Sequence, residues 1–448
     1  MTPILSPDST REPQSWGRYP QVKHTRVLPI YWRSDVPDLA RTGQCMLPHA
    51  YGRSYGDSCL NENGIALDVS HLNRFISFDA ESGVLCCEAG VSLADILELI
   101  VARGWFLPVT PGTKYVSVGG AIANDIHGKN HHSGGTFGCH VQRLALLRSD
   151  GQCLICSPTE NAALFQATIG GLGLTGLILW AEIQLKRIVN PYIDSESIRF
   201  TSLDEFFALS AESDRDFTYT VSWVDLLVGG EALCRGIFTR GNHNQSPALV
   251  HKPVKRRLSL TMPCNLPQFV LNPLTVKGFN ELYYHVQLPK RVRKIVPYDP
   301  FFYPLDGIQQ WNRLYGKRGF LQYQFVVPFE GGREAMREIL GRIRKARAGS
   351  FLTVLKEFGH VTSPSMLSFP RPGLTLALDF AYAGEKTLLL LDDLDTIVRH
   401  FNGAVYPAKD ARMSAASFQQ FYPRWQAFTQ YVDPHFSSSF WRRVSTQP

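Results

Sequence analysis

The sequence lacks an apolar run long enough to cross a bilayer, which takes about 20 consecutive residues. Residues 1–9 have neither a basic start nor an apolar stretch, so we expect no signal peptide. The nine cysteines are an odd number scattered through apolar segments, which favours reduced thiols and a cytoplasmic location. Cys153 and Cys156 have the spacing of a metal or redox pair. No second pair accompanies them, so we expect buried thiols and no metal site.

The common nucleotide-binding patterns are also missing. No G-x-x-x-x-G-K-[ST] occurs, and Gly171–Gly176 matches G-x-G-x-x-G only in letters, because a strand-like run follows where a helix is required. The net charge of +7 is moderate and fits an anionic cofactor and an anionic substrate. No groove-reading helix accompanies the basic clusters at 252–257 and 290–294, so we expect no nucleic-acid partner.

Three glycine-rich loops stand out in the first 180 residues, at His49–Asp57, Val118–His132 and Thr168–Ile178. One such loop alone usually marks a turn. Glycine lets the backbone approach a ligand closely, and successive N–H groups in such a loop form an anion site. The second loop adds His127 and Lys129 at its far end. Together the loops predict a wall along a large, partly anionic cofactor with titratable groups at one end.

The pattern of elements predicts an α+β protein. A hairpin is expected over 75–88, a helix capped by Ser92 and ended by Gly104, and another helix capped by Thr159. Farther on, strand-like runs alternate with helical ones, which predicts an antiparallel sheet with helices on one face. These strands are expected at 218–223, 321–327 and 374–380, and the helices at 333–347 and 386–401.

The loops, in this order, resemble the FAD-binding domain of the vanillyl-alcohol oxidase / p-cresol methylhydroxylase superfamily. Within it the chain is most similar to the decaprenylphosphoryl-β-D-ribose 2-oxidase family, chiefly through Asp125-Ile-His-Gly-Lys-Asn-His-His132 and Tyr406-Pro-Ala-Lys-Asp410. The resemblance covers nearly the whole chain and is weakest over 187–300. It implies a two-subdomain FAD-binding domain at 15–190, an antiparallel-sheet cap domain that carries the substrate at 191–402, and a segment returning to the FAD domain at 403–448.

The resemblance also implies the residues of the site. Catalytic roles fall to His127, Lys409 and Tyr55, and Lys409 either accepts a proton or stays charged beside the flavin. Substrate contacts fall to Lys129, Gln322, Gln324, Lys356 and Thr375. The cofactor-binding set is His49, Ala50, Tyr51, Gly52, Arg53, Ser54, Tyr55, Gly56, Asp57, Ser58, Gly112, Thr113, Val116, Ser117, Val118, Gly119, Gly120, Ala123, Asn124, Asp125, Ile126, His127, Gly128, Gly173, Gly176, Ile178 and Tyr406.

Two positions depart from the family pattern. Thr375 stands where the family has Asn, and Ala377 where it has Cys. Both side chains face the pocket in the family. Threonine keeps a donor and an acceptor but is shorter, and alanine loses the thiol, so the preference for a particular sugar and lipid is the property most open to change.

The activity that the resemblance implies is oxidation of the 2-hydroxyl of a polyprenyl-phosphoryl β-D-ribofuranose to a 2-keto sugar by non-covalently bound FAD. Quinone or oxygen would be the electron acceptor. A separate short-chain NAD(P)-dependent reductase would complete the epimerisation to the arabinose form. One alternative is an alditol or aldonolactone oxidase of the same superfamily. Another is a protein with the flavin fold that only binds a partner.

An apolar stretch with Leu274, Phe279, Tyr283 and Tyr284 lies between the basic clusters. The simpler interpretation is a solvated loop with charged edges. The alternative is peripheral contact with an anionic membrane surface through residues 250–295, at the inner face of the membrane.

Overall fold

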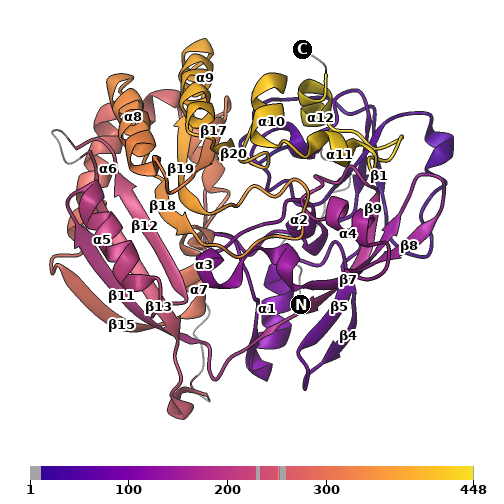
Figure 1. Ribbon diagram of the computed structural model, residues 1–448, viewed down its shortest axis with the longest axis horizontal. Helices are drawn as coiled ribbons and strands as arrows, with labels where there is room; N and C mark the ends of the chain where they lie inside the picture. Colours follow the sequence, from indigo (N-terminus) through magenta and orange to yellow (C-terminus); the bar gives the residue numbers. More distant parts are fainter. Residues whose placement is uncertain (1–11, 229–232, 251, 253–258, 447–448) are drawn as a thin grey trace.

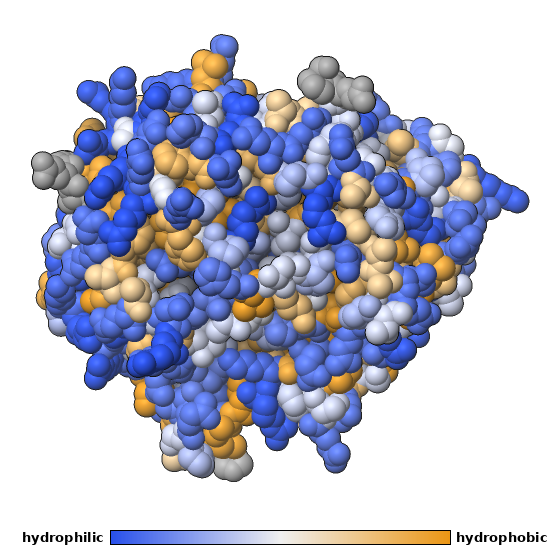
Figure 2. All heavy atoms as spheres, in the orientation of Figure 1, coloured by the Kyte–Doolittle hydropathy of each residue, from blue (hydrophilic) through white to orange (hydrophobic). Residues whose placement is uncertain are grey.

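In the computed structural model, residues 12–228, 233–250, 252 and 259–446 are described. Two regions lie side by side in Figure 1, one from the N-terminal part of the chain and one around a large sheet. The face in Figure 2 is mostly hydrophilic and carries apolar residues in separate patches. Across the described ranges, no helix has the length and apolar composition that a membrane span requires.

The N-terminal region contains a parallel sheet of order β1-β3-β2 and an antiparallel sheet of order β4-β5-β9-β7-β8. The strands of the first are β1 (Arg26–Pro29), β2 (Met46–His49) and β3 (Ile65–Asp68). Those of the second are β4 (Phe75–Asp79), β5 (Val84–Glu88), β7 (Val141–Leu147), β8 (Cys153–Cys156) and β9 (Leu177–Gln184). The expected hairpin at 75–88 is confirmed. The two-residue strands β6 (Trp105–Phe106) and β10 (Lys186–Arg187) pair nearby.

The helices of this region are short, and their caps explain their bounds. They are α1 (Leu93–Ile100), α2 (Val118–Ala123), α3 (His131–Gly134) and α4 (Ala162–Thr168). Ser92 and Asp95 form the expected capping box at α1, and Gly104 has φ +78° beyond its last turn. The prediction that Thr159 caps α4 was wrong. The Ser157 hydroxyl accepts from the N–H of Thr159 and of Glu160, so a turn occupies this position and α4 begins later.

The second region is built on an eight-stranded antiparallel sheet of order β15-β11-β13-β12-β18-β19-β17-β20. Its strands are β11 (Tyr192–Phe200), β12 (Tyr219–Asp225), β13 (Arg235–His243), β15 (Arg291–Pro297), β17 (Phe320–Val327), β18 (Thr353–Phe358), β19 (Gly373–Ala381) and β20 (Ala404–Val405). The helices α5 (Leu203–Ser213), α8 (Gly332–Lys345) and α9 (Glu385–His400) supply residues to the core beside it (Figure 1). The predicted α+β class is confirmed, as are the strands and helices expected here.

Successive side chains along each strand point to opposite faces of this sheet, and the two faces differ in polarity. In β17, Tyr323 and Phe325 belong to the core that includes α8 and α9, whereas Gln322 and Gln324 line a cavity on the opposite side. Glutamine is costly to bury in an apolar core unless its amide group is hydrogen-bonded. The polar alternation therefore marks the face that serves a ligand.

Smaller elements border that cavity. They are α6 (Pro273–Val286), α7 (Tyr298–Phe302) and β16 (Ile308–Gln309), which pairs with β14 (Leu260–Thr261). Residues Lys255, Arg256 and Arg257 of the first basic cluster lie outside the described residues.

The chain ends with α10 (Ala415–Phe421), α11 (Trp425–Thr429) and α12 (Ser439–Val444), drawn in yellow beside the N-terminal region in Figure 1. The N–H of Met46 donates to the His435 carbonyl at 2.7 Å, and the Ser437 N–H donates to the Met46 carbonyl at 2.9 Å. The last segment thus adds to β2 although almost 400 residues of sequence separate them. The domain limits 15–190, 191–402 and 403–448 stay predictions.

Candidate active site

A cavity of about 930 Å³ lies between the glycine-rich loops and the polar face of the eight-stranded sheet. This volume is near the upper end of the range for ligand pockets, which fits a large ligand or two ligands together. All eight residues predicted to be catalytic or to bind substrate line it. They are Tyr55, His127, Lys129, Gln322, Gln324, Lys356, Thr375 and Lys409. Across the described residues, no cluster of His, Cys, Asp or Glu has the arrangement of a metal site.

Most of the predicted cofactor set lines the same cavity. The residues on its wall are His49, Ala50, Tyr51, Gly52, Arg53, Ser54, Tyr55, Ser58, Gly112, Thr113, Val116, Ser117, Gly119, Gly120, Ala123, Asn124, Ile126, His127, Gly128, Gly173, Gly176, Ile178 and Tyr406. Four others lie behind the wall. Val118 is fully buried in the core, and the Asp125 carboxylate accepts from the hydroxyls of Ser363 and Ser368. Gly56 and Asp57 contact the C-terminal segment.

Gly56 shows why glycine is needed at the back of the first loop. A Cβ at this position would lie 1.6 Å from the carbonyl oxygen of Asp410, so no other residue fits without moving one of the two segments. The N–H of Tyr55 also donates to the Ala408 carbonyl at 2.8 Å. The loop that carries Tyr55 and the segment that carries Lys409 are therefore packed backbone to backbone.

His127 is held between two side chains from the sheet. The Lys356 amine lies 2.9 Å from Nδ1, and the Gln324 amide nitrogen lies 3.0 Å from Nε2. Burial lowers the pKa of His127 well below 6.5, and the charges of Lys356 and its neighbours lower it further. A charged Lys356 donates to Nδ1, whereas a neutral Lys356 can accept from an Nδ1–H. The protonation states of these two residues are consequently coupled.

Lys409 faces the ring of Tyr55, with its Nζ 3.9 Å from the ring centroid. Burial lowers the pKa of Lys409 to about 7, and the Asp379 carboxylate opposes this shift. Burial likewise raises the pKa of Asp379 to about 7, although it accepts hydrogen bonds from Gln322 at 2.6 Å and Tyr315 at 3.1 Å. An amine and a carboxyl group that both titrate near neutrality suit proton transfer.

Lys129 and Lys356 bring two more amines to the cavity. Lys129 donates to the carbonyl of Phe301 and lies 4.7 Å above that ring. Burial lowers the pKa of each lysine to about 7, and for Lys356 the charges of Lys129 and Lys409 add to the effect. A bound anion would restore their charge, because an opposite charge nearby favours the ammonium form. The cavity is thus suited to an anionic ligand.

Thr375 and Ala377 face the cavity from β19, beside the strands that carry Lys356 and Gln324. The Thr375 hydroxyl lies 3.3 Å from the Gln324 amide nitrogen, so the shorter side chain still joins the polar network. Asp379 lies two residues beyond Ala377 on the same face. It was not predicted as a site residue. Strand alternation places it on this face, but its burial beside Gln322 and Tyr315 does not follow from the sequence.

An apolar chamber extends the cavity along the sheet. Its walls are Val221, Trp223, Ile237, Phe279, Tyr283, Val296, Phe351 and Val354. None of these was predicted, because in sequence they read as ordinary apolar strand and helix residues. Two stacking partners of predicted residues were also missed, Trp16 beside Arg53 and Phe369 beside Tyr406. The Arg53 guanidinium lies 4.1 Å from the Trp16 ring centroid, and Phe369 stacks on Tyr406 at 4.6 Å.

The residues on the wall fit the expected FAD. Small side chains and glycines leave room for a long planar ligand, Arg53 supplies a cation, and the Ser117 hydroxyl already caps α2 by accepting from the Gly120 N–H. Tyr406 is fixed by donating to the Asn124 carbonyl at 2.7 Å. Fixed donors and a rigid aromatic wall are what a dinucleotide with an anionic linkage requires.

Comparison with known proteins shows similarity over the whole length. Residues 36–157 match the family described as FAD binding domain. The chain is 36% identical to decaprenylphosphoryl-beta-D-ribose oxidase of Mycolicibacterium smegmatis over 456 aligned positions, which cover 98% of each chain. It is 32% identical to an uncharacterised protein from the mprA 5′ region of Streptomyces coelicolor over 375 residues, 79% of this chain and 100% of that protein.

A sugar lactone oxidase is similar over a shorter stretch. L-gulonolactone oxidase of Mus musculus is 32% identical over 124 residues, which are 27% of this chain and 28% of that protein. Most of this chain therefore lies outside that similarity.

Proposed function

The chain belongs to the decaprenylphosphoryl-β-D-ribose oxidase family, as its loops predicted, and from this premise we propose that it oxidises the 2-hydroxyl of a polyprenyl-phosphoryl β-D-ribofuranose to a 2-keto sugar. It is an FAD-dependent oxidoreductase with an FAD-binding domain of the expected type. The position of Lys356 is the observation that supports this substrate. Its amine contacts His127 of the second glycine-rich loop, and two residues along β18, Val354 pairs with Trp223 of the apolar chamber.

This arrangement orders three kinds of surface along one cavity. Glycine-rich loops come first, then the amines of Lys129 and Lys356, then apolar side chains. A phosphoryl group between a sugar and a polyprenyl chain has the same order of chemistry. The amines would hold the phosphate as charged donors, and the chamber would take the first part of the lipid.

The chemistry requires a hydride acceptor and a proton acceptor. Bound FAD supplies the hydride acceptor for the hydrogen on the sugar carbon. Lys409 takes the hydroxyl proton in its neutral form, which a pKa of about 7 makes available at neutral pH. Tyr55 fixes the amine through its ring face, and Gln322 and Gln324 offer amide groups to the sugar hydroxyls. Loss of the hydride and the proton converts the alcohol to the ketone.

We propose that FAD is bound without a covalent link to His127. Both ring nitrogens of His127 are within 3.0 Å of protein groups, Lys356 on one side and Gln324 on the other. A ring held in this way supports a role in orienting Lys356 and the substrate. Release of the yellow colour into the supernatant after acid precipitation is the expected result, and a pellet that stays yellow would contradict it.

Three further partners belong to the same proposal. The electron acceptor is quinone or oxygen. A separate short-chain NAD(P)-dependent reductase completes the epimerisation to arabinose. The protein works in the cytoplasm and contacts the inner face of the membrane, because a polyprenyl chain resides in a bilayer.

Anaerobic bleaching of the yellow flavin band tests the substrate. The ligands are a short-chain polyprenyl-phosphoryl ribose, its arabinose epimer, and a free alditol or aldonolactone. Fast bleaching by the phosphoryl ribose alone is expected and would show that Thr375 and Ala377 are compatible with this sugar. Bleaching by the alditol or lactone would replace the proposal with a sugar oxidase that needs no phosphate, and bleaching by none would refute both.

A further inference from the structure

The helix α6 has an apolar face that the protein does not cover. Its buried side is Val276, Asn280 and Tyr284, four residues apart. Beside that row, Leu282 and Val286 are 70% and 75% exposed, and Leu288 just beyond the helix is 76% exposed. Large aliphatic side chains grouped in this way on a surface mark a site of interaction.

The uncovered face continues the wall of the cavity. Phe279, Leu282, Tyr283 and Val286 follow the spacing i, i+3, i+4, i+7, so they share one side of the helix. Phe279 and Tyr283 also line the apolar chamber, where Tyr283 contacts Trp223 with 4.6 Å between ring centroids. One helix therefore carries apolar side chains from inside the chamber to the outer surface.

A second segment on the cavity wall has the same character. Ile308 of β16 lines the cavity, and it pairs with Leu260 of β14, which is 74% exposed. Phe269, in the turn that leads into α6, is 76% exposed. Two separate segments of the cavity wall thus continue into exposed apolar side chains.

Basic residues flank this surface. Residues 273–296 contain five Lys or Arg side chains, at 277, 290, 291, 293 and 294, and a single acidic one, Glu281. Lys290 pairs with Glu205, and Arg291 and Arg293 pair with Glu196. Among the described residues Lys277 and Lys294 have no ion-pair partner. Apolar groups bordered by cations match the interface of an anionic bilayer, where the chains take the apolar groups and the headgroups take the cations.

We propose that the outer face of α6, formed by Leu282, Val286 and Leu288, docks this protein on an anionic lipid bilayer. The proposal rests on the proposed function, because only a lipid-linked substrate gives the chamber a reason to open there. In the docked state the chamber mouth faces the bilayer. The polyprenyl chain then passes along the stacked rings of Phe279 and Tyr283 without crossing water.

Vesicle flotation of the holoprotein at low salt tests the docking. The vesicles contain phosphatidylcholine with phosphatidylglycerol, or phosphatidylcholine alone. The double variant Leu282→Asp/Val286→Asp is compared with Leu389→Asp, which alters an exposed leucine of α9 that is 60% exposed. We expect the wild type and Leu389→Asp to float with anionic vesicles, and the bound fraction of the double variant to fall at least tenfold. High salt, or vesicles of phosphatidylcholine alone, should also reduce the bound fraction of the wild type.

Several outcomes would overturn the docking proposal. They are no flotation of the wild type, equal flotation of the double variant, or a concentration-dependent dimer of the wild type that the double variant loses. Flotation needs no substrate, so it stays informative if the phosphoryl ribose fails to bleach the flavin. Bleaching by a water-soluble short-chain substrate without flotation would refute the docking and leave the activity standing. A wild-type flavin spectrum and melting temperature in the double variant will show that it is folded.

Discussion

The amine of Lys409 is the group on which the proposed chemistry depends most. It lines the cavity, faces the Tyr55 ring at 3.9 Å and has a pKa lowered to about 7. Replacement by methionine keeps the length of the side chain and removes its proton acceptor. We expect Lys409→Met to slow anaerobic flavin reduction by about 10²–10⁴-fold, the range for loss of a general base. FAD content should stay unchanged.

Lys386→Met is the matched control, because Lys386 is exposed at the start of α9. It should reduce flavin at the wild-type rate. A Lys409→Met rate within about tenfold of wild type would remove Lys409 from proton transfer, since general bases contribute more than this.

The pH dependence distinguishes the two roles of Lys409. As a base it must be neutral, so the limiting rate of flavin reduction should rise with pH through about 7 and then level off. As a fixed charge it must be protonated, and the limiting rate would instead fall over the same range. Lys129 and Lys356 must be charged to hold phosphate. The apparent Kd for the phosphoryl sugar should therefore increase above about pH 7 in either case.

At the level of single residues, the sequence was most informative where several chemical types crowd together. The run from Asp125 to His132 singled out His127 and Lys129, and both line the cavity. Asp379 was missed because an aspartate near the end of a strand is common and usually solvated. Its burial depends on Tyr315 and Gln322, which lie 64 and 57 residues away and cannot be paired with it from the sequence.

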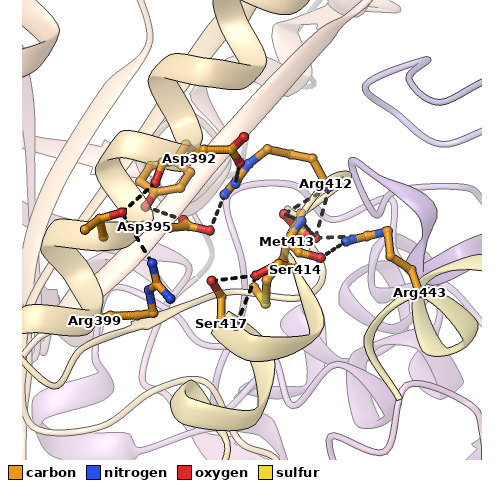
Figure 3. Close-up of polar contacts among 11 residues, drawn as sticks. Asp392, Asp395, Arg399, Arg412, Met413, Ser414, Ser417 and Arg443 are labelled. Atoms are coloured by element: carbon orange, nitrogen blue, oxygen red, sulfur yellow. Dashed lines mark hydrogen bonds and ion pairs between the residues drawn. The ribbon is translucent and has the colours of Figure 1, made fainter. Parts of the chain in front are cut away.

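Among the elements, the segment after β20 (Ala404–Val405) is held by a set of ion pairs. Figure 3 shows Arg412 reaching toward Asp392 and Asp395 of α9, and Arg443 of α12 reaching the segment from the other side. Arg443 pairs with Asp410 at 3.0 Å and with Asp57 at 2.6 Å. Because Asp57 follows the Tyr55 loop and Asp410 follows Lys409, this one guanidinium joins the two segments whose side chains meet in the cavity.

We therefore expect Arg443→Met to change the catalytic rate, although Arg443 does not line the cavity. Two carboxylates, each 4% exposed, would lose their cation. We expect a loss of about 2 kcal/mol in stability, below the range for fully buried pairs because Arg443 is 26% exposed. The limiting rate of flavin reduction should fall at least tenfold, and its pH midpoint should move because the burial of Lys409, which lowers its pKa, would change.

Arg442→Met is the neighbouring control on α12, since Arg442 contacts Asn61 and Glu62 instead. It should leave the pH midpoint in place. If Arg443→Met lowers the melting temperature but keeps both the rate and the pH midpoint, the ion pairs are structural only. Partial rescue by Arg443→Lys would support the positioning role.

Regular elements were predictable because alternation and capping are local. The strands at 321–327 and 374–380 and the capping box of α1 follow from adjacent residues. The helix α4 was misplaced because Ser157 competes as a local hydrogen-bond acceptor. For residues 250–295 the sequence suggested a solvated loop or contact with a membrane, but not the helix α6, whose apolar spacing normally indicates a buried helix face.

For the whole molecule, the cavity exists only because distant segments meet. Lys356 and His127 are 229 residues apart, and Tyr55 and Lys409 belong to opposite ends of the chain. No local pattern encodes these contacts. They entered the sequence prediction only through resemblance to a family. Physical reasoning from the loops alone predicted a large anionic cofactor, but not which sheet residues would face it.

Folding this cavity also places Lys129, Lys356 and Lys409 where each has its pKa lowered to about 7. In the unfolded chain a lysine titrates near 10.4. Between pH 7 and about 10 the unfolded state then binds more protons, so the free energy of unfolding should rise with pH. Below about pH 7 both states are protonated and the cost of burying the charges is fully present.

Urea unfolding of the FAD-free protein at pH 6, 7, 8 and 9 measures this effect. We expect Lys356→Met to be more stable than wild type at pH 6, by up to a few kcal/mol, because a buried charge is removed. The difference should shrink toward pH 9, where Lys356 is neutral when folded. For Lys386→Met, at an exposed site, the free energy of unfolding should change with pH in parallel to that of the wild type. If all three stability curves are parallel, Lys356 keeps its ordinary pKa in the folded protein and is charged at neutral pH with or without a bound phosphate.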